Sequence, residues 1–335
     1  MLFRKLIRTA WSYKAQFISM ILMITLGMGM FLGFNMEWRT IEYDTGKFFE
    51  STNYADFRLY SKDGFTSSEL EAIKDIKGVE KATRFLSVNL DLKGEKNKAV
   101  ALDVSENYTV STFIATSGSD YDEKKQGFWL SDKFAAANKF KIGDTLTLTF
   151  KGEEISGEIL GLVKSGEHMI CLADTNQLMP DYNSFGFAYI TPAKLESIVK
   201  DNLETEIKTE LKEKGMPDEM IEKSLGSILT KEAVEKAKDS LFVQINLCSD
   251  LSKEDLEKAV KGKLGKTIMV TSKDEHVVYK EAMGEAEEGK TMGSILPVLF
   301  LAIAILTMVT TMHRIATKEK LQIGTLKALG FKNRR

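Results

Sequence analysis

The segment Ala15-Gln-Phe-Ile-Ser-Met-Ile-Leu-Met-Ile-Thr-Leu-Gly-Met-Gly-Met-Phe-Leu-Gly-Phe-Asn-Met36 contains 22 residues and no charged side chain. A second uncharged segment of the same length runs from Thr291 to Met312, between Lys290 and His313. An α-helix rises ~1.5 Å per residue, so each segment is long enough to cross a hydrocarbon core ~30 Å thick. We therefore predict two transmembrane helices, over residues 17–36 and 291–312.

Two other interpretations of the first segment are a cleaved signal peptide and the buried helix of a soluble protein. The apolar part of a signal peptide has only ~7–15 residues and ends in small residues before a cleavage site. Here Gly33-Phe-Asn-Met-Glu-Trp38 follows, without an Ala-x-Ala pattern. Helices of soluble proteins seldom contain so long a run without a charge, so the sequence favours a membrane span.

Positive charges gather beside both spans. Residues 1–16 carry Lys and Arg and no acid, and residues 314–335 carry a large excess of Lys and Arg over one acid, Glu319. Since the chain as a whole has a net charge of −2, the residues between the two ends must be strongly acidic. Lys and Arg near the ends of spans stay on the cytoplasmic side. We expect residues 1–16 and 313–335 in the cytoplasm and residues 37–290 outside.

Residues 37–290 alternate between strand and helix patterns, which predicts an α+β membrane protein whose two transmembrane helices flank a mixed α/β domain. Two strand–helix–strand units, near 55–93 and 241–272, stand beside the spans and can pair into one membrane-proximal subdomain. In the first unit, Thr66-Ser-Ser-Glu69 has the pattern of a capping box, in which the Thr and Glu side chains satisfy orphan amides at a helix start.

Between these units, residues 128–190 predict a β-rich lobe with a hairpin turn at Lys151-Gly152. Residues 192–240 are rich in Lys, Glu, Leu and Ile at helical spacing, with an interruption at Gly215-Met-Pro217. This pattern predicts an insertion of two helices, either a protruding arm that holds a partner or a simple surface addition.

No motif of a catalytic, metal or cofactor site stands out. Gly284-Glu-Ala-Glu-Glu-Gly289-Lys290-Thr291 fits the letters of a phosphate-binding loop, but its carboxylates repel a triphosphate. The histidines have no spacing typical of a metal site. Cys171 and Cys248 either form one disulfide or remain two thiols. An acidic domain also disfavours nucleic acid as a partner. We expect no enzyme activity, no metal and no cofactor in this chain.

Small residues in the first span suggest a packing face. Gly29 and Gly33 stand one helical turn apart, and small residues let transmembrane helices approach closely. The alternative is that glycine is simply common in such spans. The predicted transmembrane packing site is Gly29 and Gly33.

The segment after the second span, Thr317-Lys-Glu-Lys-Leu-Gln-Ile-Gly-Thr-Leu-Lys-Ala-Leu-Gly-Phe331, places apolar residues among lysines. This spacing predicts a short amphipathic helix. Such a helix lies on the lipid bilayer or enters a groove on a partner protein, and periodicity does not distinguish the two.

Within this tail, Gln322-Ile-Gly-Thr-Leu-Lys-Ala-Leu-Gly330 resembles the cytoplasmic segment of the FtsX-like permeases of ATP-binding-cassette (ABC) transporters, the group that includes MacB-type exporters. The family pattern is Arg-Glu-Ile-Gly followed by Leu-x-Ala-Leu-Gly, and here Leu321-Gln322 replaces the Arg-Glu pair. Arg8-Thr-Ala-Trp-Ser-Tyr-Lys14 and Ile142-Gly-Asp-Thr-Leu146 are similar to the family's N-terminus and outer domain.

The resemblance implies a permease subunit in a bacterial plasma membrane, with four spans per unit, a second permease copy or half, and a separate ABC-type ATP-binding subunit that binds ATP. It implies export or extraction of a peptide, drug or lipoprotein. The residues implied to contact the ATPase are Lys318, Glu319, Gln322, Ile323, Gly324, Leu326, Lys327, Leu329 and Gly330.

Because only two spans are present, we expect the sequence to be the N-terminal portion of such a permease. The alternative is a two-span receptor, in which an outer sensor domain signals through the second helix. A permease predicts a third span soon after Arg335, whereas a receptor predicts a heptad linker and a signalling domain.

Overall fold

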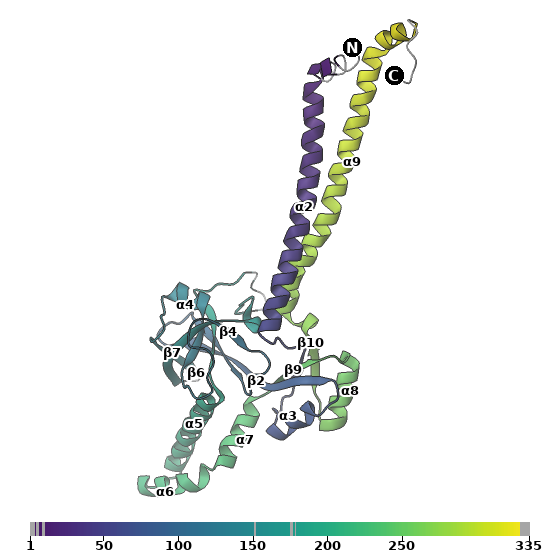
Figure 1. The fold of residues 1–335 in the computed structure, drawn as a ribbon. Coiled ribbons are helices and arrows are strands. Elements are labelled where there is room, and N and C mark those ends of the chain that lie inside the picture. The colour runs from purple at the N-terminus through teal and green to yellow at the C-terminus, as the bar shows by residue number, and fades with distance from the viewer. Residues whose placement is uncertain are drawn as a thin grey trace. The chain divides into compact units, whose positions relative to one another are not determined.

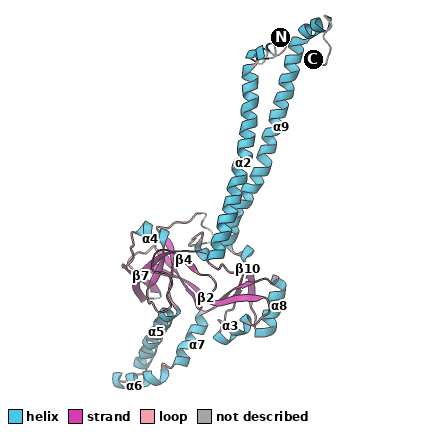
Figure 2. Cartoon of the chain, in the orientation of Figure 1, coloured by secondary structure: helices cyan, strands magenta, loops and turns pink. Residues whose placement is uncertain are grey.

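The computed structural model describes Arg4, Ile7, Arg8 and residues 11–150, 152–174, 177 and 179–328. Contacts divide the chain into two compact units (Figures 1 and 2). We call Met1–Asp44 with Met283–Arg335 the helix pair, and Thr45–Ala282 the sheet domain.

The helix pair consists of α2 (Lys14–Ser51) and α9 (Val277–Ala328), whose last and first turns belong to the sheet domain. Both are long and apolar enough to cross a membrane, and most of their apolar surface is exposed. A helix buried in a soluble core hides that surface, so the exposure supports membrane spans. Both helices continue beyond the predicted spans, because the residues from Glu37 to Ser51 and from Val277 to Lys290 contain no proline.

The two helices run antiparallel, so the start of α2 and the end of α9 lie at the same end of the pair (Figure 1). Lys318 Nζ lies 5.9 Å from the ring centroid of Tyr13 at that end. The predicted amphipathic tail continues α9 without a break as far as Ala328.

The sheet domain is built on one sheet of ten strands in the order β10-β1-β9-β2-β3-β8-β5-β7-β4, with β6 paired to β2 and β7. The pairs β3–β8 and β5–β7 are parallel and the others are antiparallel. The strands are β1 (Phe57–Tyr60), β2 (Val79–Leu92), β3 (Ala99–Ser105), β4 (Phe113–Gly118), β5 (Phe128–Ser131), β6 (Thr145–Phe150), β7 (Glu153–Ser165), β8 (Phe185–Tyr189), β9 (Gln244–Ser249) and β10 (Met269–Ser272). The helices of the sheet domain are α3 (Ser67–Lys74), α4 (Asp132–Asn138), α5 (Pro192–Glu213), α6 (Asp218–Ile228), α7 (Lys231–Leu241) and α8 (Lys253–Leu264), with 3₁₀ turns η1 (Gly166–His168) and η2 (Lys273–Glu275).

The two predicted strand–helix–strand units do pair. β1 lies between β9 and β10, and β9 also pairs with β2, so strands from both units form one end of the sheet. α3 and α8 cover this end, with Leu70, Ile73, Leu256 and Val260 in a shared core. The capping box that opens α3 is present in full.

The predicted β-rich lobe is also present. The long strand β2 joins it to the end of the sheet that contains β1, β9 and β10. The first part of β2 pairs with β9, its second part with β3, and its end with β6. The core of this lobe includes the fully buried side chains Phe128, Leu130, Phe134 and Leu146.

The insertion at 192–240 holds three helices among the described residues, not the two expected from the sequence. α5 and α7 lie side by side, and α6 lies at the far end of the arm they form (Figure 1). The extra break falls at Thr230, whose side chain accepts a hydrogen bond from the Ala233 amide and so begins α7.

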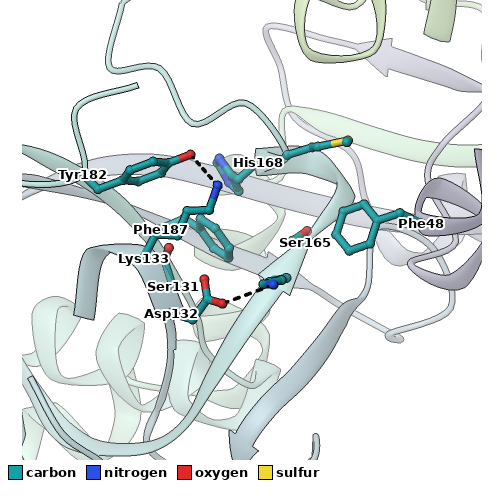
Figure 3. A pocket seen from close by; sticks show the side chains of 10 residues that line it. Phe48, Ser131, Asp132, Lys133, Ser165, His168, Tyr182 and Phe187 are labelled. Carbon is teal, nitrogen blue, oxygen red and sulfur yellow. Dashed lines mark hydrogen bonds and ion pairs between the residues drawn. The ribbon is translucent and has the colours of Figure 1, made fainter. Parts of the chain in front are cut away.

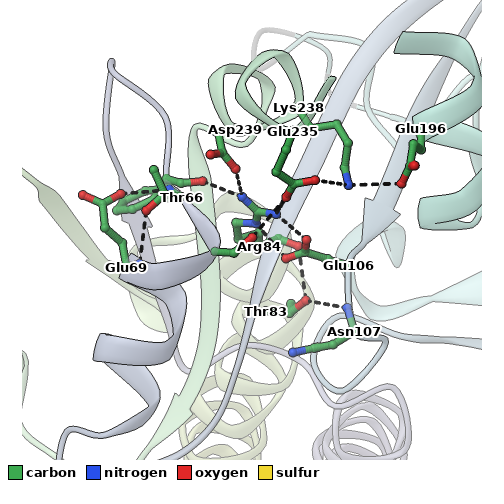
Figure 4. A network of polar contacts seen from close by, with 12 residues as sticks. Thr66, Glu69, Thr83, Arg84, Glu106, Asn107, Glu196, Glu235, Lys238 and Asp239 are labelled. Carbon is green, nitrogen blue, oxygen red and sulfur yellow. Dashed lines mark hydrogen bonds and ion pairs between the residues drawn. The ribbon is translucent and has the colours of Figure 1, made fainter. Parts of the chain in front are cut away.

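Arg84 of β2 fastens this arm to the sheet (Figure 4). Its side chain is fully buried and forms ion pairs with Glu106, with Asp239 and, at 3.4 Å, with Glu235. It also donates to the Phe65 carbonyl at 2.9 Å. Asp239 and Glu235 belong to α7, so a single guanidinium holds carboxylates from two distant segments together.

We predict that Arg84→Met lowers stability by about 3 kcal/mol, because it leaves several partly buried carboxylates without their shared cation. In this variant, the α7 amides should exchange hydrogen faster than in the wild type, and the melting temperature should be lower. The control is Lys93→Met, which removes an exposed ion pair with Glu154 and should change stability by less than about 1 kcal/mol. Equal effects of the two substitutions would contradict this role of Arg84.

Candidate functional site

Aromatic rings gather in the sheet domain where α2 ends and α9 begins. The ring centroids of Phe49 and Tyr54 are 4.5 Å apart, and Tyr279 lies 5.1 Å from Phe49 and 5.9 Å from Tyr54. We call Phe49, Tyr54, His276 and Tyr279 the joint. Through it, the chain segments that enter and leave the sheet domain share one packed contact.

Gly166 of η1 allows the chain to pack closely at the joint. A Cβ atom at this position would lie 2.5 Å from Thr52 Oγ1, 3.1 Å from Tyr54 Cδ2 and 3.2 Å from Phe49 Cδ1. A larger residue would therefore force the Thr52 hydroxyl to move and the two rings to shift, and glycine avoids this. The segment after α2 is also fixed by the backbone, since the Ser111 and Thr112 amides donate to the carbonyls of Asn53 and Thr52 at 2.8 Å each.

A buried ion pair lies beneath the joint. Arg58 of β1 places Nη2 3.0 Å from Oε1 and 2.9 Å from Oε2 of Glu167, and both side chains are buried. The Ser111 hydroxyl donates to Glu167 Oε1 at 2.8 Å, and the Asn246 amide donates to that hydroxyl at 2.6 Å. The Arg58 guanidinium also stacks on the Tyr54 ring at 4.5 Å. The pair therefore connects strands β1 and β9, the loop at Ser111 and η1 to the joint.

The protonation state of Glu167 follows from this network. Burial alone would raise its pKa, but the charge of Arg58, with further help from the Ser111 hydroxyl, holds the pKa below its ordinary value. Glu167 is thus ionised at neutral pH, which keeps the ion pair intact.

His276 is held in its neutral form. The Tyr54 hydroxyl lies 2.5 Å from His276 Nδ1, and burial keeps that hydroxyl protonated by raising the pKa of Tyr54, so Tyr54 donates and the histidine accepts. Burial and, second, the nearby Arg58 charge lower the pKa of His276 to about 4. Protonation of His276 would turn the acceptor into a donor and break this hydrogen bond.

His168 has the opposite character. Its Nε2 lies 2.6 Å from Asp103 Oδ2, and Asp103 is fully buried. Burial opposes the charge, but the Asp103 carboxylate outweighs it and raises the pKa of His168 to about 10. His168 is therefore an imidazolium at neutral pH, although it is adjacent in sequence to the ionised Glu167.

Two pockets open beside η1. One, of about 370 Å³, is lined by Glu167, His168 and His276 together with Tyr60 and Glu281. The other, of about 240 Å³, lies on the side of α4 and includes His168 and Phe48. Among the described residues, no group of three or more His, Cys, Asp or Glu side chains is placed to hold a metal ion.

The predicted ATPase contacts lie at the end of α9. Seven of these residues belong to α9: Lys318, Glu319, Gln322, Ile323, Gly324, Leu326 and Lys327. The other two, Leu329 and Gly330, lie outside the described residues. Open space surrounds Gly324, and Leu321 beside the predicted set is 85% exposed. An exposed apolar side chain on this helix is available to a partner or to lipid, so the predicted contact remains a prediction.

The glycines that pack α2 against α9 are not those singled out in the sequence. A Cβ on Gly27 would lie 3.3 Å from Phe300 Cβ, and one on Gly293 would lie 2.9 Å from Phe34 Cβ. Gly289 similarly approaches Trp38 at 3.1 Å. A Cβ added to Gly29 or to Gly33 would have no atom within 4 Å, so the face that these two glycines share remains open to a further helix.

Other sequence features take their simpler interpretation. Gly284–Thr291 lies inside α9, and a helix cannot wrap its amides around a phosphate as a loop does. Cys171 and Cys248 are both free thiols.

The sequence analysis missed Arg58, Glu167 and His276. One signal was available, since Arg58 stands near the start of the predicted strand–helix–strand unit at 55–93, where a buried cation requires a buried anion. Its partner lies 109 positions away, so local periodicity could not identify Glu167.

The class that these features define is a mixed α/β domain on two helices able to span a membrane. No family model matches the chain, and no curated protein sequence matches it. The extracellular domain of the noncanonic ABC-type transporter YknZ from Gram-positive bacteria is similar at 12% identity, covering 64% of this chain and 99% of that one, with a TM-score of 0.35. The periplasmic region of MacB from Actinobacillus actinomycetemcomitans is similar at 12% identity, covering 71% and 95%, with a TM-score of 0.36.

We predict that Glu167→Ala lowers stability by about 3 kcal/mol, because it leaves the Arg58 charge buried without an anion. The double variant Arg58→Met with Glu167→Met should be more stable than Glu167→Ala, since removing both charges removes the desolvation penalty. Thermal unfolding of the purified chain measures both. The control is Glu257→Ala, an exposed helix position in α8. A double variant less stable than the single one would contradict this account.

We also predict that stability falls by about 2 kcal/mol between pH 6.5 and pH 4.5 through His276. Its folded pKa lies below its unfolded pKa, so the unfolded chain binds more protons in this window and acid favours unfolding. His276→Asn keeps an acceptor for Tyr54 and should flatten this limb of the curve. Glu167, whose pKa is lowered, decreases the free energy of unfolding only below about pH 4.5. His168, whose pKa is raised, stabilises the fold at low pH and loses this contribution as the pH rises above 6.5. If stability falls equally between pH 6.5 and pH 4.5 in the wild type and in His276→Asn, His276 is not the cause of the fall.

Proposed function

We infer that this chain is the permease subunit of an ABC transporter in a bacterial plasma membrane, with both termini in the cytoplasm and the sheet domain outside. ATP binds to a separate subunit, and this chain has no enzyme activity of its own. The Lys and Arg residues beside the two spans support this orientation.

The observation that carries the proposal is the continuity of α9. It is one helix of 52 residues, ~78 Å long, whereas a hydrocarbon core is ~30 Å thick. Its first turn contributes Tyr279 to the joint, and its last turns carry residues 322–328 of the segment that resembles the permease tail. One continuous helix thus contains a residue of the joint and the described part of the proposed ATPase contact.

The proposed mechanism is mechanical. ATP binding draws the ATPase against Lys318–Gly330 and displaces the cytoplasmic end of α9. Because Tyr279 packs on Phe49 and Tyr54, and Arg58 stacks on Tyr54, the displacement reaches the sheet domain through the joint. Movement of that domain then exports or extracts a peptide, drug or lipoprotein outside the membrane.

The open face of α2 fits a permease with further spans. Gly29 and Gly33 do not pack against α9, so their faces are free to receive a helix from a second permease copy or half. We propose that contact as the role of these two glycines.

We predict that Gly324→Asp combined with Leu326→Asp lowers recovery of the ATPase at least about fivefold, because acids on the docking face oppose burial against a partner. The measurement is co-purification of the full-length protein with the ATP-binding subunit encoded beside it. The control is Gly262→Asp in α8, another helical glycine surrounded by open space, which should leave recovery unchanged.

Unchanged recovery with the tail variant would exclude this docking segment. If the full-length protein recovers no ATP-binding subunit and instead recovers a signalling partner, the two-span receptor would replace the permease as the function.

A further inference from the structure

The smaller pocket of the sheet domain, of about 240 Å³, contains a concentration of positive charge (Figure 3). Three cationic side chains line it, Lys133, Lys164 and His168. They come from α4, β7 and η1, so three separate elements direct cations to one cavity. All of the residues that line it belong to the sheet domain and to the described part of the chain.

The cations are only partly neutralised by the protein. Two carboxylates offset part of this positive charge. Asp132 lies 3.6 Å from Lys164 Nζ, and Asp103 forms an ion pair with His168. The first distance exceeds that of a charge-assisted hydrogen bond, which is ~2.7–2.9 Å. Lys133 is held by a neutral group, since it donates to the Tyr182 hydroxyl at 3.2 Å and lies 4.8 Å from the centre of that ring. One positive charge therefore remains, which matches a monoanion.

Part of the lining is apolar and suits an organic ligand. Phe48, Met169 and Phe187 line the pocket, and Phe187 stacks on His168 with ring centroids 4.5 Å apart. The Ser131 hydroxyl also faces the cavity and does not cap the helix that follows it, so it is available as a hydrogen-bond donor. This combination of a few convergent polar groups and apolar walls is typical of ligand sites.

We propose that this pocket binds a carboxylate attached to a small apolar group, held by Lys133, Lys164 and the Ser131 hydroxyl. Its volume is below the ~300 Å³ at which typical ligand sites begin, so the occupant is a small organic acid or the carboxyl end of a peptide whose remainder lies in solvent. The shared chemistry is the carboxylate beside an apolar side group, with Phe48 and Phe187 as its apolar contacts.

The site goes beyond the proposed transport function and does not depend on it. Phe48 belongs to the last turn of α2, next to Phe49 of the joint. A ligand bound in the pocket therefore contacts Phe48, which is the neighbour in sequence of the joint residue Phe49.

The test is isothermal titration calorimetry on the purified full chain in nanodiscs. The probes are N-acetylphenylalanine, its amide, the tripeptide Ala-Ala-Phe and its C-terminal amide. We expect at least one of the two acids to bind about tenfold or more tighter than its amide, about 1.4 kcal/mol, because only the acid places an anion between the lysines. Binding of the free acid alone identifies a small-acid site, and binding of the tripeptide alone identifies a chain-end site.

The matched variants are Lys133→Gln with Lys164→Gln, and Lys96→Gln with Lys223→Gln at exposed positions outside the pocket. The first pair should weaken acid binding at least about tenfold, ~1.4 kcal/mol, and the second should leave it unchanged. The proposal is overturned if acids and amides bind equally, if the pocket variant binds as the wild type does, or if no probe binds at about 10 mM. The comparison of acid with amide uses only the wild-type chain, so it holds even if the pocket variant misfolds.

Discussion

The buried ion pair between Arg58 and Glu167 is the interaction on which the rest of the sheet domain's arrangement depends. Removing two charges from water is unfavourable by several kcal/mol per ion, so the pair persists only where geometry and further hydrogen bonds satisfy both groups. Here the Ser111 hydroxyl donates to the carboxylate and Asn246 donates to that hydroxyl, whereas the guanidinium uses Nη2 for the ion pair and lies over the Tyr54 ring, with its Nε and Nη1 buried without a hydrogen-bond partner. These partners must come together for either charge to be buried, and this requirement fixes β1, β9, η1 and the Ser111 loop relative to one another.

The same requirement explains the small and unusual residues nearby. Gly166 precedes Glu167 and leaves room for Thr52, Tyr54 and Phe49, so the turn that presents the carboxylate also admits the segment after α2. Asn53, in that segment, has a positive φ of 45°, a conformation that Asn tolerates better than most residues. The backbone bends there, and its carbonyls are then paired with the amides of Ser111 and Thr112.

Local signals in the sequence predicted much of the fold. The two long apolar helices, the capping box at Thr66 and the hairpin after Phe150 each depend on residues close together in the chain, and each is present, the two helices being long and apolar enough to cross a membrane. The third helix of the arm was missed because a single threonine, Thr230, ends one helical pattern and begins another. The joint and the ion pair could not be predicted as contacts, since 222 positions separate Tyr54 from His276 and 109 separate Arg58 from Glu167, and no periodicity relates them. The packing of α2 against α9 shows the same limit, because the orientation of the two helices places Gly27 and Gly293 at their contact, whereas the packing of Gly29 and Gly33 against another helix stays a prediction.

The three residues of η1 bring these features together. Gly166 packs against the end of α2, Glu167 binds Arg58 beneath the joint, and His168 binds Asp103 and lines both pockets. Because the three residues are consecutive in one turn, His168 and Glu167 share a peptide bond. Glu167 in turn cannot leave Arg58 without exposing a buried charge to an apolar surrounding. The turn therefore places a residue that lines both pockets directly beside the carboxylate that pairs with Arg58, which is the shortest connection in the chain between the pockets and the ion pair beneath the joint.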